Sequence, residues 1–245
     1  MVAKINGGPE LQMNRPLQAL MVASIVLPQL WCAATQKEPS AAEQLAQWLA
    51  WTLEDARGWL ASTGFWAVCA ALAFERALYT IVWLRPKDVM KLAKRPFWKQ
   101  FGTPVDVVVV GFHVSKVLQF GSFAVWYALY GPVALRAALV GATRLQWVLF
   151  AQGVGLGQLL NTAIYQAIGK NGVYYGYKLG KPVAWCTDFP FNVFTAHPQY
   201  VGATTTAWGL VALLATEPHA KAGWFGLGAL QAAMYAYMAA VEQYC

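Results

Sequence analysis

Five long apolar segments constrain the fold of this 245-residue chain more than any other feature of its sequence. A helix that crosses a membrane needs about 20 apolar residues, with a range near 17–25, and three of the segments reach that length easily. The other two are marginal, and a short turn separates them, so they could form a helical hairpin. The segments are residues 65–84, 105–130, 145–169, 200–216 and 223–241. The pattern predicts an all-α fold, a polytopic membrane helix bundle with about 4–6 embedded helices.

The composition is that of a membrane protein rather than a soluble globule. Hydrophobic residues make up 58% of the chain, charged residues make up 12%, and the mean hydropathy is +0.40. A soluble domain carries about 25% charged residues. The four cysteines are scattered without a CxxC pair, which argues against a disulfide framework and against a zinc site.

Lys and Arg residues gather in one connecting segment, residues 85–103, which holds six of them against Asp88. Residues 131–144 hold two, and residues 170–199 hold three. Cytoplasmic loops carry an excess of Lys and Arg, so we expect 85–103 and 170–199 to face the cytosol. The flanking apolar runs argue against nucleic acid as the partner of the basic segment, and we interpret it as a marker of topology beside anionic lipid.

Residues 1–64 are interpreted as an N-terminal extension, and residues 65–245 as the main membrane domain. The apolar run at 17–34 is broken by Pro28, and either an embedded or re-entrant helix or a cleaved signal peptide would explain it. Residues 41–60 place apolar side chains at helical spacing, with charged side chains largely on the other side. This pattern predicts an amphipathic helix, which either lies in the membrane interface or packs on the rest of the protein.

Charged side chains also lie inside two of the apolar segments: Glu75, Arg76, Asp106, His113 and Lys116. A charge at the centre of a spanning helix costs about 2.5–3.5 kcal/mol on insertion scales, so such residues normally face the bundle interior and pair with one another. Two interpretations stay open. The charges form interhelical ion pairs, Glu75 or Asp106 with Arg76 or Lys116, or they bind a polar headgroup.

Residues 170–203 contain the most informative motifs. FPFN at 189–192 is followed by a spacer and by P-x-Y-x-G at 198–202, and Tyr174-Tyr175-Gly176 lies upstream with Gly172 before it. With Gly155-Leu156-Gly157 in the preceding apolar segment, this set resembles the phosphatidylethanolamine N-methyltransferase family. The resemblance covers roughly residues 65–245. One departure is Gln243, which follows Glu242 where the family has a second glutamate.

The resemblance implies methyl transfer from S-adenosyl-L-methionine to the amine of phosphatidylethanolamine or of its mono- and dimethyl derivatives, in the endoplasmic reticulum membrane. The sulfonium is a strong electrophile, so the reaction needs no metal. A base must remove a proton from the amine, whose ammonium form has a pKa near 10, like that of Lys. The candidate bases and catalytic residues are His197, Glu242 and Asp188. The candidate residues for cofactor binding are Gly155, Gly157, Pro198, Tyr200 and Glu242.

Each motif also has a simpler explanation. Gly153 and Gly157 form a G-x-x-x-G pattern, which in lipid most often marks a helix-packing face. Pro198 suits the first turn of any helix, and the free N–H groups there favour an anion. The P-x-Y-x-G motif also occurs in isoprenylcysteine carboxyl methyltransferases and membrane sterol reductases, so enzymes of those classes remain alternatives. A small non-enzymatic transporter is a further alternative.

Overall fold

The structure is a computed structural model, and it describes residues 40–129, 133–192 and 197–245. Within these ranges all regular secondary structure is helical, in agreement with the predicted all-α class. The apolar run predicted at 17–34 lies outside the described residues.

Five long helices follow the five predicted apolar segments closely. They are α4 (Thr63–Leu84), α7 (Pro104–Leu129), α9 (Arg144–Val173), α10 (Pro198–Leu213) and α12 (Trp224–Tyr244). The largest difference is in α9, which continues four residues beyond the predicted end, past a kink at Gly169 where φ is +63°. Glycine adopts this left-handed conformation without steric cost, so the chain turns there without losing its helical course on either side.

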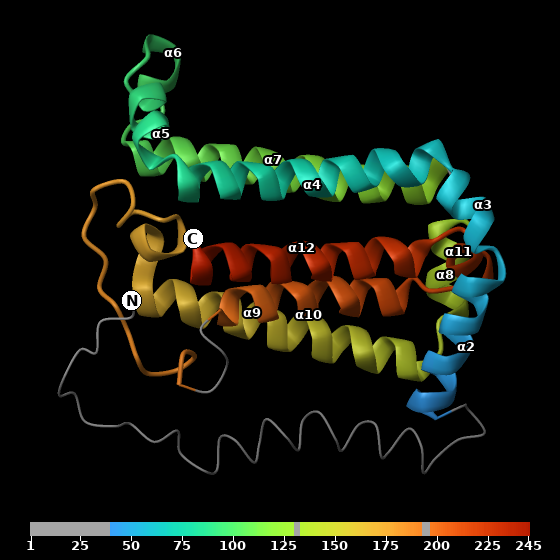
Figure 1. The fold of residues 1–245 in the computed structure, drawn as a ribbon. Coiled ribbons are helices and arrows are strands. Elements are labelled where there is room, and N and C mark those ends of the chain that lie inside the picture. The colour runs from blue at the N-terminus through green and yellow to red at the C-terminus, as the bar shows by residue number, and fades with distance from the viewer. Residues whose placement is uncertain (1–39, 130–132, 193–196) are drawn as a thin grey trace.

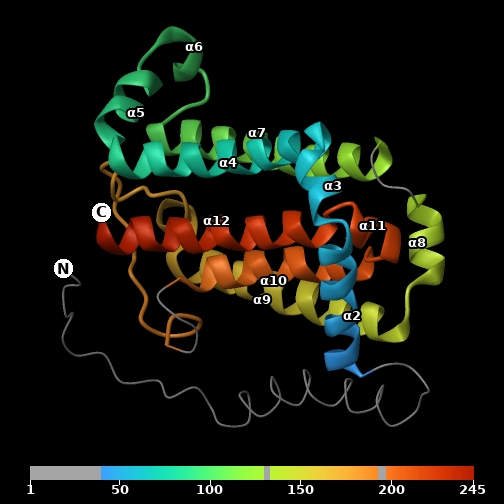
Figure 2. The same ribbon diagram turned by 45° about the vertical axis from the view of Figure 1, so that its right-hand side comes forward.

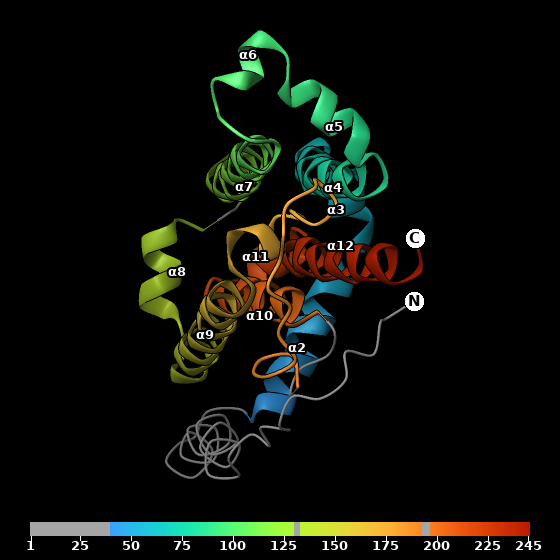
Figure 3. The ribbon, with the colours of Figure 1, turned by 90° about the vertical axis from the view of Figure 1, so that its left-hand side faces the viewer.

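The long helices run side by side in two layers (Figures 1 and 3). Helices α4 and α7 pack together in one layer, and α9, α10 and α12 form the other. The most extensive contact in the fold is between α9 and α10, and α12 joins the layers by packing on both α4 and α10. The predicted hairpin of the last two segments is therefore present, with α11 (Glu217–Lys221) in its turn.

Short helices cover the two ends of the bundle. At one end, α5 (Pro86–Ala93) and α6 (Pro96–Lys99) project from the α4–α7 connection, and residues 174–192 lie at the same end (Figure 2). At the opposite end lie α2 (Ala41–Glu54), α3 (Ala56–Ala61), α8 (Leu135–Gly141) and α11. Residues 85–103 and 174–192 thus share one end of the bundle, as the Lys and Arg counts of 85–103 and 170–199 predicted.

The predicted amphipathic helix is divided into α2 and α3 at Asp55. Its start is fixed by a capping box, in which Ser40 and Glu43 bond to each other's backbone N–H groups. Trp48 is buried and stacks on Phe225, with 5.1 Å between ring centroids, so one face packs on the protein. The opposite face exposes a row of leucines one turn apart: Leu45, Leu49 and Leu53. The buried face matches the prediction that this helix packs on the protein, and the exposed leucine face is compatible with the prediction that it lies in the membrane interface.

The outer surface of the bundle is strongly apolar. Large hydrophobic side chains more than half exposed lie along both helices of the α4–α7 layer, among them Phe74, Val114, Val117, Phe120 and Leu129. An exposed apolar surface of this kind marks contact with a membrane or with another protein. By length and composition, two of the described helices, α4 and α7, are suited to cross a membrane.

Candidate functional site

Glu242, in the last turn of α12, is the centre of a hydrogen-bonded cluster. Tyr175 donates a hydrogen bond to its Oε1 over 2.5 Å, and Tyr200 donates a second to the same oxygen. The two hydroxyl oxygens are 2.9 Å apart. The Nδ1 atom of His197 lies 3.3 Å from Oε2. Two separate parts of the chain, the turn after α9 and the start of α10, therefore converge on the carboxylate of α12, at the end of the bundle that carries α5 and α6.

Local backbone structure explains how these side chains meet. His197 is the N-cap of α10 and Pro198 its first residue, so Tyr200 lies in the first helical turn. Tyr175 has a positive φ of 56°, which is uncommon for a residue other than glycine. In this tight turn the N–H of Gly176 bonds to the carbonyl of Asn171 over 2.6 Å. Strained conformations of this kind gather at functional sites, where the surrounding structure maintains them.

The surroundings of Tyr175 keep its hydroxyl protonated. Burial raises its pKa well above the ordinary value of 10, and the nearby Tyr200 and Glu242 raise the pKa further. A protonated hydroxyl can donate to the carboxylate, as the bond to Oε1 shows. Tyr175 therefore fixes the position of Glu242 and leaves Oε2, on the side of His197, as the more available oxygen.

A cavity of about 220 Å³ lies beside this cluster, and we call it the Glu242 cavity. Besides Glu242, His197 and Pro198, six aromatic side chains line it: Trp83, Tyr175, Tyr177, Trp185, Phe191 and Tyr200. The remaining wall residues come from α9 and the start of α10: Ile164, Ile168, Gly172, Val173 and Gln199. Within the chain segments described, no side-chain hydrogen bond caps the N-terminus of α10. The cavity thus combines a carboxylate, aromatic faces and a helix N-terminus, which suits a ligand with a planar ring and both charges.

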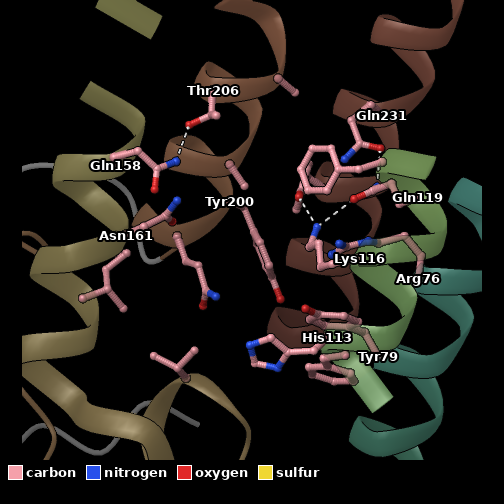
Figure 4. A pocket seen from close by; sticks show the side chains of 18 of the residues that line it. Arg76, Tyr79, His113, Lys116, Gln119, Gln158, Asn161, Tyr200, Thr206 and Gln231 are labelled. Atoms are coloured by element: carbon pink, nitrogen blue, oxygen red, sulfur yellow. Dashed lines mark hydrogen bonds between the residues drawn. The ribbon is translucent and has the colours of Figure 1, made fainter. Parts of the chain in front are cut away.

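A second cavity, of about 360 Å³, lies between the two helical layers (Figure 4), and we call it the Lys116 cavity. Arg76, Lys116 and Gln119 lie on one side, and Gln158 and Thr206 lie on the other. The two cavities share four wall residues: Ile164, Val173, Gln199 and Tyr200. The ring of Tyr200 extends between the two sides of the Lys116 cavity, so its hydroxyl is a point of contact between the cavities.

Of the predicted site residues, the structure brings together Glu242, His197, Pro198 and Tyr200. Asp188 lies apart from them. It is exposed in the segment between α9 and α10 and lines neither cavity, although its backbone carbonyl accepts a hydrogen bond from the N–H of Phe191. The geometry therefore gives Asp188 no contact with this cluster.

Gly155 and Gly157 also lie apart from the Glu242 cluster, in the middle of α9. Gly157 is buried against α10, where an added Cβ would overlap Thr206 and the carbonyl of Gly202. Gly153 behaves alike, since a Cβ there would lie 2.8 Å from the carbonyl oxygen of Thr205. This is the helix-packing face that the G-x-x-x-G spacing indicates. Gly155 is exposed, and no atom outside its own helix backbone would lie within 4 Å of its Cβ.

The charges inside the helices form two ion pairs between helices. Lys116 of α7 binds Glu75 of α4, with 2.7 Å between Nζ and Oε1. The second pair differs from the prediction, because Asp106 binds Lys170 of α9 and not Arg76 or Lys116. Asp106 lies in the first turn of α7, near the end of the bundle, and hydrogen bonds with Thr103 hold it there. It is thus too far along the helix to reach the cluster around Glu75.

Sequence reasoning missed two features of the site. It included Tyr175 only as a member of a motif, not as the partner of Glu242. It also missed a buried row of polar contacts in which Lys116 donates to Gln119 and Gln119 donates to Gln231, over 3.0 and 2.9 Å. Uncharged amides in otherwise apolar helices were the available signal, because buried polar groups need partners and mark the inside of a membrane bundle.

Comparison with known proteins yields one family and one relative. A family model described as phospholipid methyltransferase matches residues 147–244. A phosphatidyl-N-methylethanolamine N-methyltransferase from Arabidopsis thaliana is 47% identical over 57 residues, which are 23% of this chain and 32% of the relative. The match therefore spans about a third of that relative's length. No solved structure is significantly similar.

The family match begins in the first turn of α9 and includes α10 and α12, with the Glu242 cluster. It leaves out α4 and α7, which supply Arg76 and Lys116. The resemblance drawn from the motifs is confirmed for this C-terminal part of the chain.

Proposed function

We propose that this chain is an integral membrane enzyme that N-methylates phosphatidylethanolamine or its mono- and dimethyl derivatives. The match of residues 147–244 to the phospholipid methyltransferase family model supports the proposal. The observation that carries the proposal is the pair of adjoining cavities with Tyr200 in the wall of both. A transfer between two substrates needs two sites that meet at one point, with the reacting atoms about 3–3.5 Å apart.

We assign the Glu242 cavity to the methyl donor, S-adenosyl-L-methionine. When bound, this sulfonium compound supplies an electrophilic methyl group: its carbon–sulfur bond breaks as the carbon–nitrogen bond forms, and sulfur keeps the electron pair. The donor set of the cavity fits the molecule. The Glu242 carboxylate suits an ammonium or a ribose hydroxyl, the N-terminus of α10 suits a carboxylate, and the aromatic walls suit adenine. At about 220 Å³ the cavity is smaller than most ligand sites, and the shared wall lets a ligand extend beyond it.

The lipid amine belongs in the Lys116 cavity, near Tyr200. An ammonium must lose a proton before its nitrogen can attack, and Tyr200 is the residue placed to take it. In this scheme the Tyr200 hydroxyl accepts the proton as it passes its own to Glu242, to which it is already hydrogen-bonded. His197, whose side chain is 21% exposed, receives the proton from Glu242 and releases it to water.

Membrane placement follows the same reasoning. We infer that the long helices are embedded, that 85–103 and 170–199 face the cytosol, and that residues 1–64 are an extension to the catalytic domain of 65–245. The apolar outer surface and the two helices suited to crossing a membrane support this arrangement. We assign the protein to the endoplasmic reticulum membrane, as the family resemblance implies, and imaging of a fluorescent fusion tests the assignment.

A labelling experiment tests the proposed activity. The full chain, purified in detergent, is incubated with methyl-labelled S-adenosyl-L-methionine and, separately, with phosphatidylethanolamine, its monomethyl derivative, its dimethyl derivative and a farnesylcysteine. Thin-layer separation shows which acceptor takes the label. Label in a phospholipid supports the proposal. Label in farnesylcysteine alone would replace it with another methyltransferase class. No transfer to any acceptor, together with no binding of S-adenosyl-L-methionine, would replace it with a non-enzymatic role.

A further inference from the structure

The Lys116 cavity carries an excess of positive charge. Both Arg76 and Lys116 line it, and no carboxylate from the described residues does. Glu75, just behind them and completely buried, binds both cations, with distances of 2.8 Å to Nη2 of Arg76 and 2.7 Å to Nζ of Lys116. Two cations thus share one carboxylate, which leaves the group with one net positive charge.

Neutral neighbours hold these cations without cancelling that charge. The guanidinium of Arg76 lies between two aromatic rings, 4.4 Å from the centroid of Tyr79 and 4.3 Å from that of Tyr235. Lys116 donates hydrogen bonds to the Tyr235 hydroxyl over 2.9 Å and to Gln119 over 3.0 Å. Such contacts stabilise a cation but add no negative charge. An uncompensated charge inside a membrane is costly and normally marks a substrate or ion site.

The cavity reaches the outer surface of the bundle. Two of its wall residues, Phe120 on α7 and Tyr165 on α9, are 56% and 48% exposed. They mark an opening between the two helical layers, on the apolar flank of the bundle. Behind this apolar rim the cavity is lined by buried amides, Gln119 and Gln231, and the α9 side also carries Gln158, whose amide donates to Thr206 over 3.2 Å (Figure 4). An amphipathic molecule with a polar head matches this order of surfaces.

We propose that Arg76 and Lys116 bind the phosphate of the phospholipid substrate, whose headgroup enters the cavity from the membrane between α7 and α9. This inference rests on the proposed function and names the part of the substrate that the site recognises. A phosphodiester carries one negative charge, which balances the excess charge of Glu75, Arg76 and Lys116. Arg and Lys are also the side chains that bind phosphate oxygens best. The headgroup amine then lies in the same cavity as Tyr200.

The test compares two lipids that differ only in the phosphate. One is phosphatidyl-N-methylethanolamine, and the other is a diacylglycerol ether of N-methylethanolamine with the same acyl chains. Binding to the full chain in detergent is measured by native mass spectrometry, which needs no turnover. We expect the wild type to prefer the phosphate-containing lipid about tenfold or more, as for one charge-assisted interaction. A preference near one overturns the inference.

Charge-matched variants separate the net charge from other effects. Lys116→Met removes the excess charge, and the preference should fall close to one. The double variant Glu75→Gln, Lys116→Met leaves Arg76 as a single unbalanced cation, so the preference should return. The double variant also removes the buried carboxylate that would otherwise lose one of its two partners, and it serves if the single variant fails to fold. A preference that stays lost in a folded double variant overturns the role of net charge.

Further experiments distinguish a lipid phosphate from a soluble phosphodiester, and they separate a failure of this inference from a failure of the proposed function. Glycerophospho-N-methylethanolamine, which has no acyl chains, should compete poorly, and competition equal to that of the lipid overturns lipid recognition. If the phosphate preference holds while no lipid is methylated, this inference stands and the methyltransferase proposal fails. If lipid is methylated without any preference for phosphate, the activity stands and this inference fails.

Discussion

Tyr175 and Glu242 are joined by a hydrogen bond of 2.5 Å across 67 positions of the sequence. This bond ties the turn after α9 to the last turn of α12, and the N-terminus of α10 joins them through Tyr200. One carboxylate therefore orients the groups that we assign to donor binding and to proton removal.

Replacing that carboxylate should weaken donor binding far more than it changes folding. Hydrogen bonds to charged groups are worth about 1.5–3 kcal/mol, which corresponds to a loss of roughly ten- to a hundredfold in affinity. We expect Glu242→Ala to accumulate normally and to lose most methyl transfer at limiting S-adenosyl-L-methionine. Gln243→Ala is the matched control, because Gln243 is exposed and should tolerate the change. Wild-type rates for Glu242→Ala across a full donor titration would falsify the assignment of the donor site.

Tyr200→Phe should affect turnover rather than binding. The ring that lines both cavities stays in place, but the hydroxyl that accepts the amine proton is lost, and a positioned acid–base group contributes about 10²–10⁴-fold. We expect kcat to fall by about a hundredfold at pH 7, with partial recovery as the pH rises and the free amine becomes available. Tyr244→Phe, at a residue that is 78% exposed, provides the comparison. A fall in donor affinity with unchanged kcat would contradict a role in proton transfer.

The glycines of α9 should differ sharply in what they tolerate. Gly157→Leu places a side chain into the backbone of α10, and overpacking of this kind costs about 1–3 kcal/mol or more. Gly155→Leu meets open space and should keep the wild-type melting temperature. The thermal unfolding temperature and the yield of monodisperse protein in detergent are measured for both variants. The donor affinity of the folded Gly155→Leu protein then tests whether Gly155 contacts the cofactor, because a wild-type value excludes such a contact.

Thiol labelling tests the topology. In a background where the native cysteines are replaced by serine, Lys91→Cys and Thr187→Cys should react with an impermeant reagent on one side of sealed microsomes. Arg136→Cys, at the opposite end of the bundle, should react only after the membrane is opened. All three positions are exposed, so differences in reactivity report the side of the membrane and not burial within the protein. Equal labelling of positions 91 and 136 in sealed vesicles would show that the orientation is wrong.

His219 should make the stability of the protein depend on pH. Burial lowers the pKa of this side chain from its ordinary 6.5 to about 4. Between these values the unfolded chain binds the proton and the folded chain does not. The free energy of unfolding is therefore fully retained above pH 6.5 and decreases as the pH falls towards 4. The melting temperature in detergent should fall less between pH 7 and pH 5 in His219→Gln than in the wild type. Parallel pH curves would exclude His219 as the cause.

The long helices could be predicted from the sequence because an apolar segment of about 20 residues is restricted to very few structures, above all a helix that spans a membrane. The segment predicted at 65–84 is a helix from Thr63 to Leu84, and the last predicted segment at 223–241 is a helix from Trp224 to Tyr244. Lys and Arg counts likewise predicted which connections share an end of the bundle. These properties are local, so they can be recognised without knowing which helices touch.

The site was predictable only where a motif carried it. The motif resemblance led to Glu242, Pro198 and Tyr200, but nothing in the residues around position 175 indicates a bond to position 242. That contact depends on a left-handed turn at a tyrosine and on the packing of three helices. The partner of Asp106 likewise depends on its position in the first turn of α7, and the periodicity of the sequence does not show which residues of other helices lie at that level.

The close contact of α9 and α10 also determines how this protein can open. Because Gly153 and Gly157 bring the two backbones together, neither helix can slide or rotate without a collision at Gly202 or Gly209. The wall that carries Gln158, Tyr200 and Thr206 therefore moves as a rigid body. We therefore expect any widening of the proposed lipid entrance to come from the α4–α7 pair moving away from this wall, which would displace Arg76 and Lys116 relative to Tyr200.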